Sequence, residues 1–230
     1  MRQRYLDRLT RELLNGAAPD VLVAAAERAA WTPPETLTAV LTAHGHKLPP
    51  LDPRTLRLVD DLPGLTGAED LTALLIPDLN ERTRRDLIAR FGDRPLAVVG
   101  PVRPWCAVAS SFDRARRALR LALGDAGAPV DTDDHLTEVV LRSDPEALTD
   151  LRDRVLAPLA GLRAGSRNRL TETLRAWLLH QGRRDDIAAA LFVHPQTVRY
   201  RLNQLRDLFG DRLGDPRQVL ELTIALGCPH

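Results

Sequence analysis

The sequence has little cysteine, no long apolar segment and no signal-peptide core, and each shortage narrows what the chain can be. Its two cysteines, Cys106 and Cys228, lie far apart and match no metal-binding spacing, so we expect free thiols. No apolar run approaches the roughly 18 residues that a membrane span needs. The N-terminus (MRQRYLDRLTRELL) is charged throughout. We therefore expect a cytoplasmic protein that makes no membrane contact.

An excess of charge of one sign is also missing. The formal net charge is +1, so nucleic-acid binding would have to depend on a local surface. Of the 32 basic residues only Lys47 is a lysine. Richness in Arg, Ala and Leu is typical of a GC-rich bacterial coding bias, so a single surface arginine is weak evidence of function. A chain of 230 residues can form one or two domains with a sizeable core.

Signatures of nucleotide and metal chemistry are absent as well. The chain contains no P-loop and no G-x-G-x-x-G. His44 and His46 could ligate a metal only with a third partner, and a solvated loop is the commoner setting for such a pair. Asp60 with Asp61, and the acidic run Asp131–Asp134, fit solvated turns or helix caps better than cation sites. We expect no metal, no cofactor and no enzymatic activity.

The stretch from Arg184 to Leu208 has the periodicity of two short helices. Pro195 suits the first turn of the second helix, where its missing N–H costs nothing. The inward-facing residues at helical spacing are Ile187, Ala188 and Leu191 in the first helix, and Val198, Leu202 and Leu205 in the second. Two helices joined by the turn Phe192–His194 predict a helix-turn-helix. Phe192 stands where many such turns have glycine, so we expect a turn without positive φ, with His194 capping or packing at the helix start.

The outward face of the second helix, about Pro195 to Leu208, is polar. No acidic residue occurs from His194 to Arg206. Asn and Gln can bond adenine edges, Arg can bond guanine, and hydroxyl groups suit phosphates. The predicted DNA-contacting residues are Gln196, Thr197, Arg199, Tyr200, Arg201, Asn203 and Gln204. The alternative is a protein–protein interaction module whose helical domain does not bind DNA, and the near-neutral net charge is the one feature that supports it.

Further residues around this segment carry a resemblance to a known family. They are Leu170, Thr173, Leu174, Trp177 and Leu178, then Ala188, Leu191 and Val193, the run HPQTVRYRL from His194 to Leu202, and Leu208, Gly210, Leu213, Asp215, Pro216, Ala225 and Leu226. This pattern resembles the C-terminal helix-turn-helix of the PucR/CdaR-type bacterial transcriptional regulators. The resemblance implies a regulator that binds double-stranded DNA as a homodimer or higher oligomer, with the second helix in the major groove. It also implies a small-molecule effector of unspecified chemistry.

The stretch from about Glu35 to Gly124 alternates short apolar runs with Pro and Gly signals. The expected strands are Leu37–Ala43, Thr55–Val59, Leu71–Ile76 and Leu96–Val99, and the expected helices are Arg82–Phe91 and Phe112–Leu123. The segment Val99–Leu119 resembles the end of the GGDEF-like domain of the same regulators. Cyclase chemistry needs carboxylates on a tight turn to hold two Mg²⁺ ions, and the nearest candidate, Thr66–Asp70, does not reproduce the motif. We expect a degenerate sensor or dimerisation domain.

The sequence thus predicts an α+β protein. The expected parts are N-terminal helices (1–34), a small α/β GGDEF-like domain (35–124), a helical connector (125–165) and an all-α DNA-binding domain (166–230). The segment Gly161–Asn168 is small and polar and is the best boundary candidate. The predicted helix caps are Asp20, Ser110 or Ser111, the run Asp131–Asp134, and Ser166.

Overall fold

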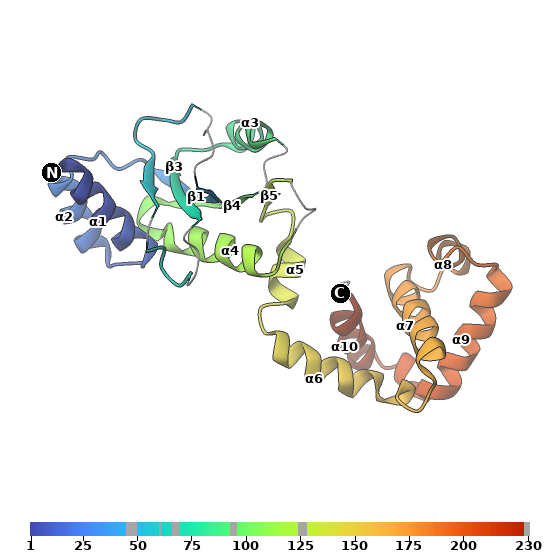
Figure 1. Ribbon diagram of the computed structural model, residues 1–230. Helices are drawn as coiled ribbons and strands as arrows, with labels where there is room; N and C mark the ends of the chain where they lie inside the picture. The colour runs from blue at the N-terminus through green and yellow to red at the C-terminus, as the bar shows by residue number, and fades with distance from the viewer. Residues whose placement is uncertain (45–49, 60, 66–69, 93–95, 124–127, 228–230) are drawn as a thin grey trace. The chain divides into compact units, whose positions relative to one another are not determined.

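The computed structural model describes residues 1–44, 50–59, 61–65, 70–92, 96–123 and 128–227 (Figure 1). Its contacts divide the chain into two units, Met1–Val140 and Leu141–His230. The first unit combines helices with a mixed sheet, and the described part of the second is helical. The predicted α+β class is therefore confirmed.

Unit 1 is built on a sheet with the strand order β2-β3-β1-β4-β5. The strands are β1 (Thr36–Ala43), β2 (Leu56–Leu58), β3 (Leu71–Pro77), β4 (Ala97–Pro104) and β5 (Val130–Asp131). Strand β1 lies at the centre and pairs antiparallel with β3 and β4, while β5 pairs parallel with β4. The four predicted strands are present. Strand β5 was not predicted, because two residues of parallel pairing leave no periodic pattern.

Strand β4 runs further than its apolar stretch indicates. It continues from Val99 through Gly100 and Pro101 to Pro104, and its pairing with β1 shifts register between Thr38 and Val40. Strand β5 pairs only with Val98 and Val99 of β4. Among the described residues, no strand pairs with the rest of β4 along that edge. A proline is tolerated in a strand at such an edge or bulge, because its missing N–H removes no ladder bond.

Helices cover both faces of the sheet. One face is covered by α1 (Arg2–Leu14), α2 (Pro19–Arg28) and α4 (Ala109–Arg120), and the other by α3 (Glu81–Phe91). Alternating strand residues divide between two apolar clusters, as the two-residue period of a strand requires. On β1, Leu37, Ala39 and Leu41 join the cluster with α1, α2 and α4, whereas Val40 joins the cluster with α3. Both faces of the central strand are therefore buried.

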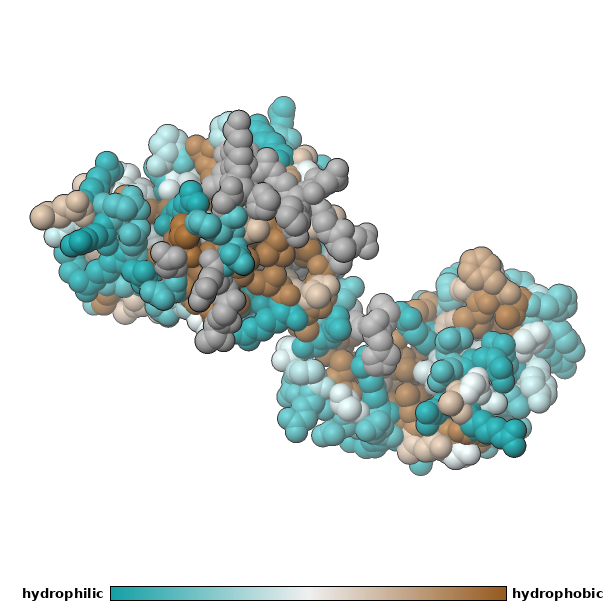
Figure 2. Space-filling model, in the orientation of Figure 1, coloured by the Kyte–Doolittle hydropathy of each residue, from teal (hydrophilic) through white to brown (hydrophobic). Residues whose placement is uncertain are grey.

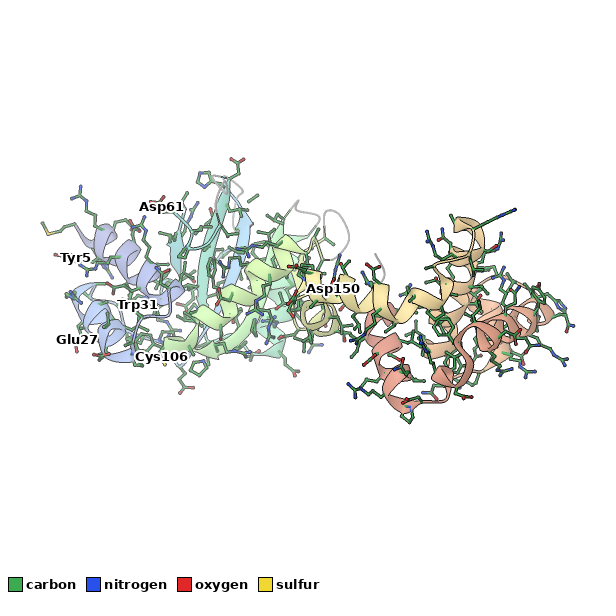
Figure 3. All side chains as sticks on the ribbon, turned by 90° about the horizontal axis from the view of Figure 1, so that it is seen from below. Tyr5, Glu27, Trp31, Asp61, Cys106 and Asp150 are labelled. Atoms are coloured by element: carbon green, nitrogen blue, oxygen red, sulfur yellow. The ribbon has the colours of Figure 1, made fainter. Side chains whose placement is uncertain are left out.

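Trp31 joins the N-terminal helices to the sheet domain. Its indole Nε1–H donates to the Arg54 carbonyl oxygen at 2.9 Å, and its ring meets Trp105 edge-on with 6.2 Å between centroids. Cys106 is half-buried beside the same apolar cluster, in the region where Figure 3 labels Trp31 and Cys106. Cys228 lies outside the described residues.

Four of the predicted helix caps are wrong. Ala18 is the N-cap residue of α2, and Asp20 lies within its first turn. Helix α4 begins at Ala109, so Ser110 and Ser111 lie inside it, and Ser111 instead accepts the Ala39 N–H at 3.0 Å through its hydroxyl oxygen. Ser166 likewise lies inside a helix whose N-cap is Arg163.

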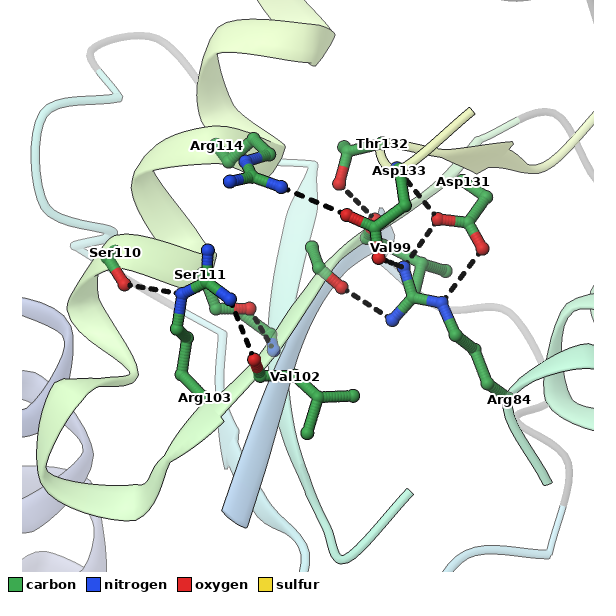
Figure 4. A network of polar contacts seen from close by, with 12 residues as sticks. Arg84, Val99, Val102, Arg103, Ser110, Ser111, Arg114, Asp131, Thr132 and Asp133 are labelled. Carbon is green, nitrogen blue, oxygen red and sulfur yellow. Dashed lines mark hydrogen bonds and ion pairs between the residues drawn. The ribbon is translucent and has the colours of Figure 1, made fainter. Parts of the chain in front are cut away.

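The acidic run is the fourth of these cases. Asp131 accepts both Nε and Nη2 of Arg84, at 2.8 and 2.5 Å, and Thr132 donates its hydroxyl to the Val99 carbonyl oxygen at 2.9 Å (Figure 4). Asp133 pairs with Arg114 at 2.9 Å. The following helix, α5 (Leu136–Leu141), begins beyond these residues. Partners far along the chain, which no local pattern indicates, therefore take the side chains that were expected to cap.

The ion pair between Arg84 of α3 and Asp131 of β5 links these two elements. The Arg84 side chain is 9% exposed and also donates to the Gly100 carbonyl oxygen at 2.8 Å. Burial alone would raise the pKa of Asp131, but the hydrogen bonds from Arg84 and from the Asp133 N–H, together with the positive charge of Arg84, outweigh it and hold that pKa below its usual value. Burial would likewise lower the pKa of Arg84, but the hydrogen bond to Asp131 and the negative charges of Asp131, Asp133 and Asp134 together outweigh it, so the arginine pKa is raised. Both groups stay charged in the folded unit at neutral pH.

Unit 2 is a set of helices around one apolar core. They are α6 (Pro145–Leu156), η2 (Ala157–Leu159), α7 (Ala164–Leu179), α8 (Arg184–Ala190), α9 (Pro195–Phe209), η3 (Gly210–Leu213) and α10 (Pro216–Gly227). Helix α6 packs against α10, and Arg152 Nε donates to the Ala225 carbonyl oxygen at 2.8 Å. The boundary expected near 165 thus falls inside this unit, between η2 and the body of α7.

Candidate nucleic-acid interface

Helices α8 and α9 form the helix-turn-helix that the periodicity predicts. Ile187 and Ala188 of α8 and Val198, Leu202 and Leu205 of α9 are all buried in one core with α7. Helix α9 begins at Pro195, as expected, and ends at Phe209, one residue beyond the predicted end. The apolar residues at i, i+4 and i+7 fix which face of α9 remains outside.

The turn between the two helices corrects one expectation. Phe192 has φ 52°, whereas a turn without positive φ was expected. The Phe192 N–H bonds to the Ala189 carbonyl oxygen at 3.2 Å, and the Val193 N–H bonds to the Ala188 carbonyl oxygen at 3.0 Å. These two hydrogen bonds close the end of α8 as a Schellman motif. This motif puts the residue after the C-cap in the left-handed region, whatever its side chain. The backbone geometry therefore overrides the preference for glycine.

His194 begins α9 as its N-cap residue. Its ring Nδ1 accepts the Gln196 N–H at 3.2 Å, so it satisfies one of the donors left free at the helix start. The expectation that His194 caps the helix is confirmed.

Four of the predicted contact residues lie on the exposed face of α9. They are Gln196, Arg199, Tyr200 and Asn203. Tyr200 is 64% exposed, and its hydroxyl accepts Gln204 Nε2 at 3.0 Å. Arg206 Nη1 donates to Asn203 Oδ1 at 3.3 Å. These contacts order the polar face without burying it, so its donors and acceptors stay available.

The other three predicted residues lie on the flank that faces α7. Thr197, Arg201 and Gln204 are half-buried there and line a cavity of about 560 Å³ between α9 and the first turns of α7. Arg201 Nη1 lies 3.4 Å from the Thr173 hydroxyl of α7. The structure thus divides the predicted contact set into an outward group and a group beside α7, and the exposed Tyr200 also lines the cavity.

The sequence pattern missed two polar residues of this flank, Ser166 and Arg169. They come from the start of α7 and line the same cavity. Their position depends on how α7 crosses α9, which local sequence does not encode. The nearest sequence signal is the basic run that contains Arg163, Arg167 and Arg169.

Ion pairing separates the arginines of unit 2 into two groups. Arg154 and Arg217 contact Glu221, and Arg183 contacts Asp186. Among the described residues, no carboxylate lies within 4.0 Å of the guanidinium groups on α9 or of Arg169, although Asp207 is exposed in the last turns of α9. The region around α9 therefore carries positive charge that the domain itself does not neutralise.

An exposed apolar patch lies next to this region. The Phe192 side chain is 96% exposed, and Ala189 and Ala190 beside it are exposed too. Figure 2 shows hydrophobic side chains gathered at the α8 end of unit 2. We name these three residues the turn patch.

The candidate metal residues are not brought together. Within the described ranges, no group of three or more His, Cys, Asp or Glu side chains is placed to hold an ion. His44 Nδ1 lies 3.3 Å from the Thr72 hydroxyl, and Asp61 is 3.8 Å from Arg11. His46, Asp60 and the segment 66–69 lie outside the described residues. In the part of the chain that the structure covers, no helix is long and apolar enough to cross a membrane.

Residues 170–227 match the PucR C-terminal helix-turn-helix domain. This range contains all of α8 and α9, so the match covers the surface described above. It stops short of unit 1, where the likeness to a GGDEF domain stays a prediction.

Two groups of curated relatives are similar to the chain. An uncharacterized protein of Mycobacterium tuberculosis is 38% identical over 148 residues, which are 63% of this chain and 34% of that protein. An uncharacterized protein of Thermomonospora curvata is 36% identical over 133 residues, which are 57% of this chain and 72% of that protein. The chain thus spans about a third of the length of its mycobacterial relatives.

One solved structure is similar over most of its length. It is a regulator of polyketide synthase expression from Bifidobacterium adolescentis, with a TM-score of 0.44 and 22% identity over 97% of this chain and 91% of that chain.

Proposed function

We propose that this chain, which matches the PucR C-terminal helix-turn-helix domain over residues 170–227, is a sequence-specific DNA-binding regulator of transcription rather than an enzyme. The observation that carries the proposal is the exposed face of α9. Gln196 and Asn203 present amide groups there, Arg199 flanks them, and none of the three is engaged by a carboxylate among the described residues. These are the side-chain types that read base edges in the major groove.

The dimensions of α9 suit that role. Its 15 residues correspond to a helix roughly 22 Å long, and a helix about 10–12 Å across fits a major groove about 12 Å wide. One such helix reads only a few base pairs, so we propose a homodimer whose two α9 helices contact half-sites about 34 Å apart. A small-molecule effector sensed by unit 1 completes the proposal, as the family resemblance implies.

The test is fluorescence anisotropy of the full chain on labelled fragments from its own upstream region, at two salt concentrations. Arg199→Ala should weaken binding about tenfold or more and leave the melting temperature unchanged, because the side chain is exposed. Arg217→Ala removes the same charge from α10, which packs against α6 and α7, and serves as the matched control. Equal binding by the folded Arg199→Ala protein and the wild type would refute the assignment of α9.

The turn patch favours a second candidate, a protein–protein interaction module. A fully exposed phenylalanine beside two exposed alanines is an apolar surface that a protein partner could cover. Salt separates the two functions, since counterion release makes DNA binding fall steeply with added salt while an apolar contact changes little. Salt-insensitive capture of a protein, without DNA binding, would favour this candidate.

A further inference from the structure

Six of the ten residues that line the cavity between α7 and α9 carry groups that can donate to an anion, and the others are Leu162, Leu170, Leu208 and Asp207. Ser166 and Arg169 of α7 face Thr197, Tyr200, Arg201 and Gln204 of α9 across it. Hydroxyl, amide and guanidinium groups are the usual donors to phosphate oxygens. We call this cavity the α7–α9 groove.

The groove has a positive balance that the fold does not offset. It contains two arginines, Arg169 and Arg201, and one carboxylate, Asp207. Among the described residues, Asp207 forms no ion pair with either arginine, although all three line the same cavity. Two guanidinium groups that face one cavity repel each other, and an anion bound between them offsets that repulsion.

Hydroxyl groups rather than carboxylates orient these arginines. Arg201 Nη1 reaches the hydroxyl of Thr173, which is fully buried and itself donates to the Arg169 carbonyl oxygen at 2.7 Å. Arg169 Nη2 lies 3.4 Å from the Ser166 hydroxyl oxygen. Each contact uses one N–H of a guanidinium that has five, so the remaining donors stay free for a ligand.

The position of the groove on α9 indicates the ligand. Successive helix residues are rotated by about 100°, so Arg201 and Arg199 lie on opposite flanks of the exposed face. A helix that fills the major groove has a sugar–phosphate backbone along each flank. The flank that carries Arg201 would therefore face the backbone of one strand.

We propose that the α7–α9 groove holds a backbone phosphate of one DNA strand, between Arg169 and Arg201, with the Ser166 and Thr197 hydroxyls as further donors. This inference rests on the proposed DNA-binding function and assigns to α7 a contact that fixes the protein on the duplex without reading sequence. Arg201 is thereby a phosphate ligand and not a reader of guanine.

The test compares Arg169→Gln with the wild-type full chain. Anisotropy is measured over a salt series on two labelled duplexes of equal length, the upstream fragment and a mixed-sequence duplex. Because a phosphate contact is independent of sequence, Arg169→Gln should weaken binding to both duplexes by the same factor, about tenfold. It should also reduce the slope of log affinity against log salt by about 0.9, the value for one phosphate.

Three further variants sharpen the result. Arg169→Lys keeps the charge and should restore the wild-type slope, which also shows that the position tolerates substitution. Arg217→Gln, the matched charge control on α10, should leave the slope unchanged. Asp207→Asn removes the carboxylate of the groove and should raise the affinity for both duplexes.

An unchanged slope for folded Arg169→Gln, or a loss confined to the upstream fragment, would overturn the assignment of the groove while leaving DNA binding by α9 intact. Wild-type protein that binds neither duplex in a salt-dependent way would overturn the proposed function and this inference together.

Discussion

Replacing Arg84 with methionine tests how unit 1 is held together. The guanidinium makes two hydrogen bonds to Asp131 and one to the Gly100 carbonyl oxygen, in a site where the two side chains are 9% and 16% exposed. Removing one partner of a buried ion pair leaves the other charge desolvated, at a cost of about 3–5 kcal/mol. Asp131 keeps the Asp133 N–H at 3.0 Å, so we expect the lower end of this range.

The predicted loss is large enough to measure by calorimetry. For a unit of about this size, about 3 kcal/mol lowers the melting temperature by roughly 10 °C. The measurement is differential scanning calorimetry of the full chain, with Arg82→Met as the matched control, because Arg82 is an exposed residue of the same helix. Asp131→Asn should cost less, since Asp133 remains 3.4 Å from Arg84. If the melting temperatures of Arg84→Met and Arg82→Met are equal, the buried ion pair does not hold β5 to α3.

Three other predictions concern single positions. Gly100→Ala should destabilise unit 1 by about 1–3 kcal/mol in urea unfolding, because its Cβ would lie 2.4 Å from the Ser111 carbonyl oxygen; a neutral result would mean that α4 moves freely away from β4. Phe192→Gly should leave stability equal or raise it by up to about 1 kcal/mol, since relief of the positive φ exceeds the added chain entropy, and a clear loss would show that the exposed ring packs. The folded pKa of Asp131 is depressed, so its pairing should stabilise fully above the unfolded pKa of about 4 and be lost as the pH falls through the lower folded pKa; the melting-temperature gap between wild type and Arg84→Met should narrow over that fall, and a constant gap would contradict the ion pair.

The elements that the sequence predicted best are those whose signal is local and repeated. Helix α9 follows from a proline at its first position and from Val198, Leu202 and Leu205 at helical spacing. Strand β1 follows from a run of apolar and β-branched residues between turn signals. Helix α9 buries one face and strand β1 buries both, and the spacing of apolar residues in each segment indicates which.

The features that the sequence missed depend on partners far along the chain. Asp131 meets Arg84 across 47 positions, and Arg201 meets Thr173 across 28. A helix cap depends on backbone angles that tertiary contacts select, which is why Asp20 and Ser166 fall inside helices. The φ of Phe192 follows from the hydrogen bonds that close α8, so residue preference alone gave the wrong turn.

The most direct test of the central claim, that α9 reads DNA in the major groove, is methylation interference on the upstream fragment. Guanine N7 lies in the major groove, so a methyl group there blocks a helix that occupies it. The account predicts interference at two clusters of guanines about 10 base pairs apart, with interference at one position of each cluster lost in Arg199→Ala, because arginine is the side chain that bonds guanine. Binding that is indifferent to N7 methylation would contradict it.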